Sequence, residues 1–382
     1  MNPPVRPLHL ALVGPLYPYR GGIAHFTQSL GRSLAERGHR VSAVTFSRQY
    51  PERLFPGRTQ FETTPAGDAL DAPRLIDTVG PRSWLRAARH LRALAPDAVV
   101  FQYWMPFVAP ALGSVARRLG EGPKRLAVVH NALPHERRPG DRALSRYFLR
   151  SCDGLLALSD SVRRDVERLA PGVPVRQAAH PTYDFFGAAV PRAEARALLG
   201  LPAGGPVLLF FGFVRRYKGL HLLLDAMPGI LAQRPDVRLV VAGEFYDDEA
   251  PYRAHVRRLG LGDAVRFDAE YIPSEQVATY FGAADLVVQP YLSATQSGVA
   301  QVAFHFERPV LTTDVGGLAE SVPHERAGLV VPPEDPAALA AAAVRFFEED
   351  MAEALAAGVR EVRAATDWRH VCEALEGLAE GA

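Results

Sequence analysis

The sequence predicts an α/β protein made of two Rossmann-like, doubly wound domains, and three observations support this. Its 382 residues exceed the ~250–300 residues at which single hydrophobic cores stop growing. Short apolar runs alternate with segments of helical periodicity, which indicates parallel sheets built from βαβ units. The alternation is interrupted by a hinge rich in Pro, Gly and Ala at residues 179–205, and then restarts. We expect domains at 1–180 and 181–365 that face a central cleft.

The first domain begins with an apolar run at residues 8–14 that ends in glycine and predicts a buried strand. Residues 23–37 repeat apolar side chains at helical spacing, and Gly38 supplies a C-cap. Further strands are expected at 41–46, 98–102, 126–130 and 154–158, and helices at 84–94, 110–119 and 145–150. Residues 48–73 form a long irregular connection, which is usually functional when ordered.

The second domain repeats this alternation. Strands are expected at 207–212, 237–243, 265–267, 286–289 and 310–313, and helices at 220–233, 253–259, 276–283, 298–306 and 336–349. Ligands of doubly wound sheets bind beyond the carboxyl ends of the strands. Candidate site residues should therefore follow the strands of both domains.

Composition narrows the class of protein. Hydrophobic residues make up 48% and charged residues 22%, as in ordinary globular proteins. No apolar run approaches the ~18 residues of a membrane helix, and residues 1–7 lack the apolar region of a signal peptide. Cys152 and Cys372 lie far apart without metal-ligand spacing, so we expect reduced core residues. These features predict a cytoplasmic protein.

The net charge of +1 conceals an uneven distribution. Residues 1–180 hold 26 Lys and Arg against 14 Asp and Glu, whereas residues 181–382 hold 17 against 28. Such asymmetry suggests that the basic half meets an anionic partner. The helix at 82–92 sets four arginines beside Trp84, Leu85 and Leu91, a pattern suited to peripheral contact with an anionic membrane surface at its inner face. A merely solvated helix face is the alternative. The four arginines are Arg82, Arg86, Arg89 and Arg92.

Cations gather directly after the first strand of the second domain. The segment at 210–219 carries Gly212, then Arg215, Arg216 and Lys218 just before a helix. Arginine offers a planar fork for phosphate and lysine a point charge. The segment therefore predicts a phosphate site, with a solvated basic turn as the alternative.

A second phosphate-binding element is predicted at the start of the helix at 298–306. Thr295, Gln296, Ser297 and Gly298 supply polar groups and a glycine at a helix N-terminus, which favours a diphosphate. Plain N-capping by Ser297 would explain the same residues.

The first domain offers a glycine loop and a histidine. Gly21 and Gly22 open the first helix, where backbone can approach a ligand closely, although an ordinary βα turn would also use them. A dehydrogenase fingerprint, G-x-G-x-x-G, is absent. His130 ends a strand, and His135 and Glu136 follow it. We find no D-x-D pair and no Cys/His cluster, and we expect neither a metal nor a cofactor.

Together these residues resemble the family-4 retaining glycosyltransferases of the GT-B fold over essentially the whole chain. The matching segments are LVGPLYPYRGGIAHFTQSLGRSLAERGHRVSAVT, FFGFVRRYKGLHLLLDAM, RLVVAGE, AADLVVQPYL and RPVLTTDVGGLAESVPHERAGLVVPPEDPAALAAA. The resemblance implies a nucleotide-sugar donor, a saccharide, lipid-linked or small-molecule acceptor, transfer with retention, and no metal. No nucleic acid is expected.

The resemblance also implies roles for particular residues. Gly22 matches the glycine loop that meets donor phosphate or acceptor, and His130 matches the histidine near the transferred sugar. Lys218 matches the phosphate-binding lysine, and the Ser297–Gly298 region matches the helix start under the diphosphate. Tyr271 and Ile272 fall where the family frames the nucleobase. Residues 366–382 match the family's C-terminal helix, which crosses back to the first domain.

The sequence departs from the family at two places. The usual phosphate arginine directly after the glycine is Phe213, so Arg215 would take that role. The family's pair of glutamates aligns with Ala294 and Val302; Gln296, Ser297 or Gln301 could substitute.

Three other functions stay open on these residues. A catalytically degenerate sugar-nucleotide binder or partner protein would explain the missing glutamates. A sugar-nucleotide epimerase of the same fold needs a carboxylate cluster, for which only His135 and Glu136 are available. A nucleic-acid protein would interleave aromatic residues with its basic charge, and these are sparse.

Overall fold

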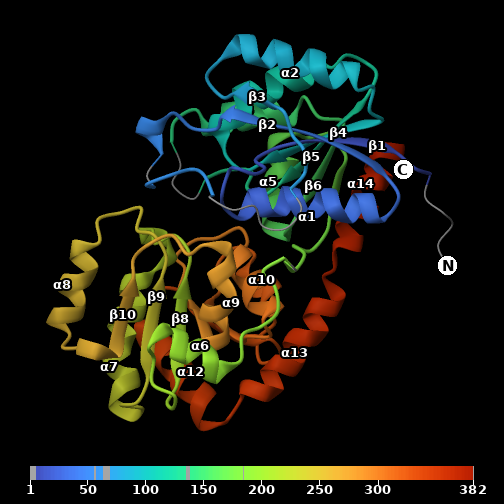
Figure 1. The fold of residues 1–382 in the computed structure, drawn as a ribbon. Coiled ribbons are helices and arrows are strands. Elements are labelled where there is room, and N and C mark those ends of the chain that lie inside the picture. Colours follow the sequence, from blue (N-terminus) through green and yellow to red (C-terminus); the bar gives the residue numbers. More distant parts are fainter. Residues whose placement is uncertain (1–5, 56, 63–68, 135–137, 184, 382) are drawn as a thin grey trace. The chain divides into compact units, whose positions relative to one another are not determined.

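The computed structural model describes residues 6–381 except 56, 63–68, 135–137 and 184. The chain forms two compact units. The first comprises Met1–His180 and Asp367–Ala382, and the second comprises Pro181–Thr366 (Figure 1). Each is described by itself.

Among the described residues, the first unit holds a parallel sheet of seven strands in the order β3-β2-β1-β4-β5-β6-β7. The strands are β1 His9–Val13, β2 Arg40–Arg48, β3 Arg74–Asp77, β4 Ala98–Tyr103, β5 Lys124–Val129, β6 Gly154–Ala157 and β7 Val175–Gln177. The central strands β1, β4 and β6 are buried along their whole length, as the apolar runs predict. The chain order reverses direction at β1, so β1 and β4 form the switch point where ligands of such sheets bind.

Helices cover both faces of this sheet. They are α1 Gly22–Glu36, α2 Pro81–Ala93, α3 Ala109–Arg117, α4 Asp141–Leu149, α5 Asp160–Leu169 and α14 Trp368–Glu380. Helices α2, α3, α4 and α5 pack in succession, while α14 packs against α1, β5 and β6. Helix α1 joins β1 to β2 and α2 joins β3 to β4, so the two crossovers run in opposite directions along the sheet. Right-handed connections then place these helices on opposite faces.

The last helix is fixed to the first unit by a partly buried ion pair. Glu376 of α14 accepts two hydrogen bonds from the Arg37 guanidinium at 2.6 and 2.8 Å and lies 2.9 Å from Nε2 of His39. Burial would raise the pKa of Glu376, but the bonds from Arg37 and His39 hold that pKa below its usual value. Trp368 packs on Phe26 of α1 with ring centroids 4.9 Å apart.

Among the described residues, the second unit holds a parallel sheet of six strands in the order β10-β9-β8-β11-β12-β13. The strands are β8 Val207–Phe211, β9 Arg238–Ala242, β10 Val265–Asp268, β11 Leu286–Gln289, β12 Val310–Thr313 and β13 Gly328–Val331. The helices are α6 Arg192–Leu199, α7 Leu220–Gln233, α8 Ala250–Arg258, α9 Ser274–Ala283, α10 Gly298–His305, α11 Leu318–Ser321, α12 Pro336–Glu348 and α13 Ala352–Ala365. The switch point lies between β8 and β11.

The predicted fold class is confirmed, and the segment predicted as the hinge contains a helix that the sequence analysis did not expect. The two units divide between His180 and Pro181, inside the predicted hinge at 179–205, and α6 lies within the same segment. The fully buried Arg196 of α6 donates hydrogen bonds to the carbonyls of Ala203, Gly205 and Ala283 and to the Asp285 carboxylate. These tertiary contacts stabilise a helix that composition alone does not indicate.

Candidate functional site

The turn after β8 in the second unit is shaped by two glycines. Gly212 and Gly219 both have positive φ, at 90° and 69°. A Cβ on Gly219 would lie 1.8 Å from the carbonyl oxygen of Pro290, so only glycine fits there. The backbone N–H of Leu292 also donates to the Tyr217 carbonyl at 2.7 Å. The cationic turn is therefore fixed to the loop that follows β11.

Lys218 is a buried cation at the centre of this turn. Its side chain is buried, with 9% of the residue exposed, and its Nζ lies 5.7 Å from the centroid of the Tyr291 ring. A Cβ on Gly212 would be 3.4 Å from this Nζ, so the ammonium lies directly over the glycine. Within the described part of the chain, no carboxylate forms an ion pair with it. Burial, and then the nearby charge of Arg215, lower the pKa of Lys218 to about 8.

Arg215 lies beside Lys218, whereas Arg216 turns outward. The Arg215 guanidinium stacks 5.9 Å from the ring of Tyr217 and 5.8 Å from that of Tyr246. Its Nε is buried and has no hydrogen-bond partner among the described residues. Arg216 is exposed, and its backbone N–H donates to the Asp247 carboxylate at 2.8 Å. Two like charges held together in a partly buried turn are typical of a site that receives an anion.

The start of α10 adjoins these cations. A Cβ on Gly212 would lie 3.4 Å from Cγ2 of Val299 as well as from Lys218 Nζ, so the first turn of α10 meets the turn after β8. Ser297 Oγ accepts from the backbone N–H of Ala300 at 3.3 Å. Ser297 therefore caps the helix. This role is compatible with phosphate binding, because one capping bond leaves the other N–H groups of the first turn available to a ligand. Thr295 and Gln296 are half-buried in the preceding loop.

Ala294 and Val302, which the resemblance aligns with the family's two glutamates, are apolar and buried. Ala294 packs with Tyr291 and Leu318, and its carbonyl oxygen would be 1.5 Å from a Cβ on Gly316. Val302 of α10 is 6% exposed. The side chain of Gln301 is also buried and accepts a long 3.5 Å hydrogen bond from Thr182, so it is already directed at a protein group.

Three aromatic rings surround the carboxyl ends of β8, β9 and β10. Phe213, which occupies the position of the family arginine, lies 4.4 Å from the ring of Tyr246 and stacks on Tyr271 at 6.1 Å and 25°. Tyr271 is half-buried and Ile272 is buried. The sequence analysis named Tyr271 and Ile272 but missed Tyr246, because it comes four residues after its strand in an acidic segment.

Gln289 is a further polar residue that the sequence analysis missed. It is the last residue of β11 and is 1% exposed, and neither its Nε2 nor its Oε1 has a hydrogen-bond partner among the described residues. A buried polar group without a partner costs roughly 1–3 kcal/mol and needs an explanation. The apolar run at 286–289 predicted this strand. A polar residue at its last position, beside the switch point, could therefore have been named as a candidate from the sequence.

In the first unit, Gly14, Gln102 and His130 meet where β1, β4 and β5 end. A Cβ on Gly14 would be 2.6 Å from Cγ of Gln102, so glycine leaves space for this side chain. His130 Nε2 lies 2.8 Å from Oε1 of Gln102, while Nε2 of Gln102 is buried without a described partner. The order of strands brings these residues together.

His130 is an uncharged imidazole. It is 4% exposed and packs edge-on against Phe26, with centroids 4.7 Å apart. Burial, and then the nearby His180, lower the pKa of His130 to about 3. Because the neutral ring faces the amide oxygen of Gln102, Nε2 carries the proton and donates it in a hydrogen bond.

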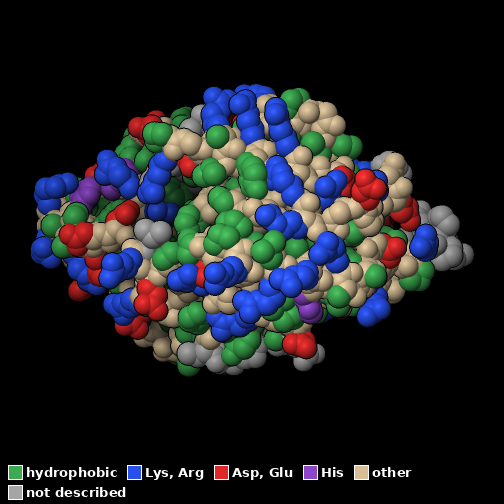
Figure 2. All heavy atoms as spheres, turned by 90° about the horizontal axis from the view of Figure 1, so that it is seen from above, with side chains coloured by type: hydrophobic (Ala, Val, Ile, Leu, Met, Phe, Trp, Pro, Cys, Tyr) green, Lys and Arg blue, Asp and Glu red, His purple; other side chains and the backbone are tan. Residues whose placement is uncertain are grey.

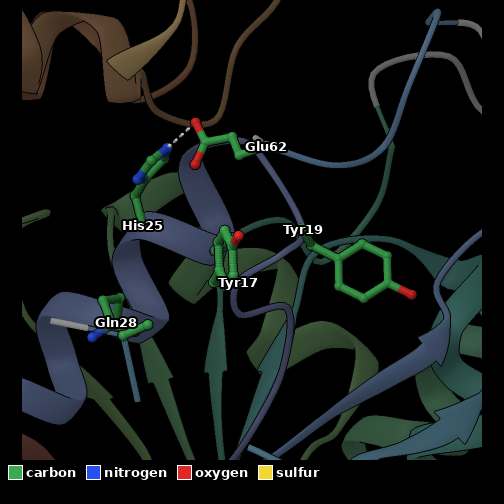
Figure 3. A pocket seen from close by; sticks show the side chains of 7 residues that line it. Tyr17, Tyr19, His25, Gln28 and Glu62 are labelled. Carbon is green, nitrogen blue, oxygen red and sulfur yellow. Dashed lines mark ion pairs between the residues drawn. The ribbon is translucent and has the colours of Figure 1, made fainter. Parts of the chain in front are cut away.

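Gly21 and Gly22 open α1 beside a hollow of about 290 Å³, which includes the space at its mouth. Gly21 has φ 106° and provides no side-chain cap. His25 and Glu62 face one another in the hollow, with Nε2 3.6 Å from Oε1, and Tyr17 and Gln28 lie below them (Figure 3). The lining residues are Tyr17, Tyr19, Ala24, His25, Gln28, Glu62 and Ala69. His135 and Glu136, named for an epimerase, lie outside the described residues.

The outer face of α2 is strongly basic. Arg82, Arg86, Arg89 and Arg92 are all exposed, and no acidic residue lies in this helix. Figure 2 looks down on the side where α2 lies in Figure 1 and shows many Lys and Arg side chains there. Of the three apolar residues named with them, only Leu85 is on the outside, at 43% exposure.

The other two apolar residues of the predicted membrane-binding pattern face inward. Leu91 is in the core, and Trp84 Nε1 donates to the Asp77 carbonyl at 2.7 Å. Across the part of the chain that the structure describes, no helix combines the length and apolar character needed to span a bilayer. In the same residues, no three His, Cys, Asp or Glu side chains cluster as metal ligands.

Comparisons with known proteins match both units. Residues 20–176 match the family model described as Glycosyltransferase Family 4, and residues 205–349 match Glycosyl transferases group 1. D-inositol 3-phosphate glycosyltransferase 1 of Catenulispora acidiphila is 31% identical over 383 residues, which is 93% of this chain and 89% of that protein. The D-inositol 3-phosphate glycosyltransferase of Streptomyces avermitilis is 35% identical over 52% of this chain. The match spans 43% of that relative, and about half the length of several others.

Solved structures match over nearly the whole chain. Sucrose-phosphate synthase from Thermosynechococcus elongatus has a TM-score of 0.75 at 24% identity and covers 98% of each chain. Anabaena HepE in complex with UDP has a TM-score of 0.71 at 14% identity, covering 98% of this chain and 100% of that one. At these identities the likeness concerns the fold, and it confirms the predicted GT-B class.

Proposed function

Because the chain belongs to the group 1, family 4 glycosyltransferases, we propose that it transfers a hexose from a nucleotide-sugar donor to a saccharide, lipid-linked or small-molecule acceptor. The proposal includes retention of configuration at the transferred carbon and catalysis without a protein-held metal ion. One observation carries it: the buried Lys218 lies beside the first turn of α10, with the half-buried Arg215 in the same turn, and neither cation has an acidic partner among the described residues.

These groups suit a departing nucleoside diphosphate. Negative charge grows on the leaving phosphate oxygen as its bond to the sugar breaks. A lysine, an arginine and helix N–H groups already in place stabilise that charge without reorganising, which is usually the largest electrostatic contribution to catalysis. A partly desolvated ammonium with a pKa near 8 gains more from a phosphate partner than a hydrated one does.

A front-face reaction agrees with the residues available. In this proposal the acceptor hydroxyl oxygen bonds to the sugar carbon on the face from which the diphosphate leaves. The hydroxyl proton passes to a leaving phosphate oxygen, so no enzymic nucleophile is needed. His130 is uncharged and therefore acts as a hydrogen-bond partner of the sugar, oriented by Gln102, rather than as a proton donor from an imidazolium.

UDP is the first candidate nucleotide. Structures of Anabaena HepE hold UDP, UDP with glucose, and UDP-glucose, and this chain shares their fold. The stacked pair Phe213 and Tyr271, next to Tyr246, offers flat aromatic surface for a base at the carboxyl ends of β8–β10. The phosphate site itself would accept UDP, GDP or ADP, so the base must be determined by measurement.

An anionic membrane surface is the proposed partner of α2. The four exposed arginines favour electrostatic adsorption, each worth about 1 kcal/mol near an anionic bilayer. Of Trp84, Leu85 and Leu91, Leu85 is the one on the outside, so we do not expect α2 to insert deeply into the bilayer. Peripheral contact at the inner face would suit a lipid-linked acceptor.

A degenerate sugar-nucleotide binder is the second candidate, and Ala294 with Val302 favours it. Both residues are buried and apolar, and the resemblance aligns them with the carboxylates that the family uses on the donor sugar and ribose. The two candidates differ in one measurable respect: a binder retains nucleotide affinity but neither transfers nor hydrolyses the donor sugar.

A thermal-shift panel of UDP, GDP, ADP and their hexose conjugates tests the proposal. A ligand at 100 times its Kd adds about 2.7 kcal/mol to stability, so one nucleotide should stand out. Lys218→Ala should remove that shift, and Arg216→Ala should keep it. NMR of the product anomer, with and without EDTA, then tests retention and metal independence. Failure of all nucleotides to stabilise the parent protein would refute the proposal.

A further inference from the structure

A buried glutamine at the switch point of the second unit is not explained by the phosphate site. Gln289 is the last residue of β11 and is 1% exposed, and neither end of its amide has a hydrogen-bond partner among the described residues. An amide can donate two hydrogen bonds and accept two, so burying this side chain unpaired destabilises the fold. Proteins retain such costs mainly at functional sites.

The alternation of side chains along β11 directs Gln289 toward α9 and α10. Val288, the residue before it, belongs to the core cluster that includes residues of α7 and α12. Because successive side chains of a strand point to opposite faces, Gln289 lies on the other face. That face is covered by α9, whose Phe281 packs on Phe211 of β8 at 4.9 Å and on Phe306 at the end of α10 at 5.5 Å. The amide therefore lies between the sheet and these helices, at the strand end that adjoins the first turn of α10.

The strand order sets Gln289 on the far side of the cations from the aromatic rings. Tyr271 and Tyr246 follow β10 and β9, and the turn with Lys218 follows β8. Gln289 ends β11, the next strand in that order. Adjacent strands are about 4.8 Å apart, so the span from β10 to β11 is roughly 14 Å. A nucleoside diphosphate with its base on the rings and its phosphates on Lys218 therefore extends its sugar-bearing end toward Gln289.

The first unit has a glutamine at the equivalent position. Gln102 is one residue before the end of β4, which lies next to β1 across the switch point, as β11 lies next to β8. It is fully buried, and its Nε2 also has no hydrogen-bond partner among the described residues. Its Oε1 accepts a hydrogen bond from His130, the proposed partner of the sugar. A glutamine at this topological position thus already serves the site in one unit.

Building on the proposed glycosyl transfer, we propose that Gln289 binds the sugar-bearing end of the nucleotide sugar. Its Nε2 donates to the distal phosphate, which carries the sugar, and its Oε1 accepts from a hydroxyl of the transferred hexose. An amide suits both partners, because it carries a donor and an acceptor side by side. Since the amide is buried in the ligand-free chain, the loop at 290–297 shifts when the nucleotide sugar enters. The ligand then supplies the bonds that the amide lacks.

Gln289→Met on the full chain tests this inference, because methionine is unbranched, similar in length and free of amide atoms. UDP affinity should fall by about tenfold or more, the value of a hydrogen bond to a charged group, and UDP-glucose affinity should fall further. UMP lacks the distal phosphate and should bind the variant as tightly as the parent. Calorimetry measures the three affinities. GDP with GMP, or ADP with AMP, replace these probes if the thermal-shift panel selects another base.

The melting temperature of the ligand-free protein separates a ligand-binding role from a structural one. Gln289→Met removes polar atoms without a described partner, so the melting temperature should stay the same or rise. Thr312→Val is the matched control. Thr312 pairs with Gln289 in the β11–β12 ladder, and its buried hydroxyl donates to the Gln289 carbonyl at 3.1 Å. This control should lower the melting temperature and leave UDP affinity unchanged.

Several outcomes would overturn the inference: unchanged UDP affinity in Gln289→Met, an equal loss for UMP and UDP, or a lower melting temperature. A loss of UDP affinity in Thr312→Val as large as that in Gln289→Met would also do so. A loss no greater for UDP-glucose than for UDP would overturn the bond to the hexose. Gln289→Leu repeats the comparison if Gln289→Met does not fold, and failure of both to fold would show that the protein itself needs the amide. If no nucleotide binds the parent protein, the proposed function fails, and that outcome is distinct because it does not depend on position 289.

Discussion

The two units share a parallel, doubly wound sheet, but the sites at their carboxyl ends differ in charge. In the second unit, Lys218 and Arg215 are held together at the switch point without described acidic partners. In the first unit the corresponding edge holds the uncharged His130 and, beside α1, the carboxylate of Glu62. The fold therefore fixes where a ligand binds, and a few side chains at the strand ends decide its charge.

The overall charge of each half gives the opposite impression. Residues 1–180 are rich in arginine, and residues 181–382 are acidic. Much of the arginine in the first half is on the outer face of helices such as α2, away from the strand ends. In the acidic half, the cations of one short turn reverse the field locally. Net charge thus predicts solubility and nonspecific partners better than it predicts the ligand of a site.

Removal of the Lys218 ammonium should give the largest loss of binding and transfer among these predictions. A small loss would contradict the comparison, because the second unit would then not be the cationic phosphate site. Lys218→Ala should weaken nucleoside diphosphate binding by about ten- to a hundredfold, since a charge-assisted hydrogen bond is worth roughly 1.5–3 kcal/mol. Transfer should fall further, because the charge on the leaving oxygen grows in the transition state. Calorimetry and turnover of the donor measure the two losses.

Two neighbours serve as controls for Lys218→Ala. Arg215→Lys should also be costly, because a point charge cannot reproduce the planar fork. Arg216→Ala should be tolerated, because that side chain is exposed. If Lys218→Ala binds and transfers like the parent, the cationic turn is not the phosphate site.

Removal of the imidazole in the first unit should affect turnover alone. His130→Ala should lower the transfer rate by about 100-fold, which is typical for loss of one preorganised hydrogen-bond donor. Nucleotide affinity should stay within twofold, because His130 and Gln102 belong to the unit without the phosphate site. Gln102→Leu should reproduce part of the loss if the amide orients the ring. Equal loss of affinity and rate would make His130 a structural residue.

The two titratable groups also predict different pH dependences. Bound diphosphate favours the charged form of Lys218, whose pKa without ligand is about 8. Affinity should therefore be nearly constant up to about pH 7, be about twofold lower at pH 8, and then decline by up to about tenfold per pH unit. Lys218→Ala should remove this decline. His130, with a pKa of about 3, stays neutral above pH 5 and should add no transition in this range.

The sequence predicted the fold class because hydrophobic periodicity is local. It missed the shorter or more exposed elements, namely β3, β7, β13, α5, α6, α11 and α13. α5 shows why: its turns are dominated by exposed charged residues, and three buried positions, Val162, Val166 and Leu169, carry the helical spacing. β3 is four residues long with one fully buried side chain, Ile76. Such short patterns are hard to distinguish from loop.

The candidate site was predictable where chemistry follows a strand directly. Lys218, Arg215 and the start of α10 follow strong apolar runs, and so they were named. The hollow was not predictable, because Glu62 and His25 are 37 residues apart and meet through backbone pairing of two irregular segments. The electrostatic state of His130 likewise depends on burial and on His180, which sequence spacing does not reveal.

The smallest predicted effect concerns the outer surfaces of the two units. If the α2 face adsorbs to anionic lipid, Arg86→Glu should weaken binding to phosphatidylserine-containing vesicles by fivefold or more. The estimate follows from about 1 kcal/mol for each basic residue near the surface.

Arg257→Glu on α8 of the second unit is the matched control, because it removes an exposed arginine from a helix that also has a basic last turn. Cosedimentation at low salt and at 0.5 M salt measures both variants, since screening with a Debye length near 10 Å at 0.1 M must weaken such contacts. Equal losses in the two variants would mean that the protein responds to its total charge and that α2 is an ordinary solvated face. A loss confined to Arg86→Glu and abolished by salt would assign the membrane contact to the first unit, on the side of its sheet opposite α1.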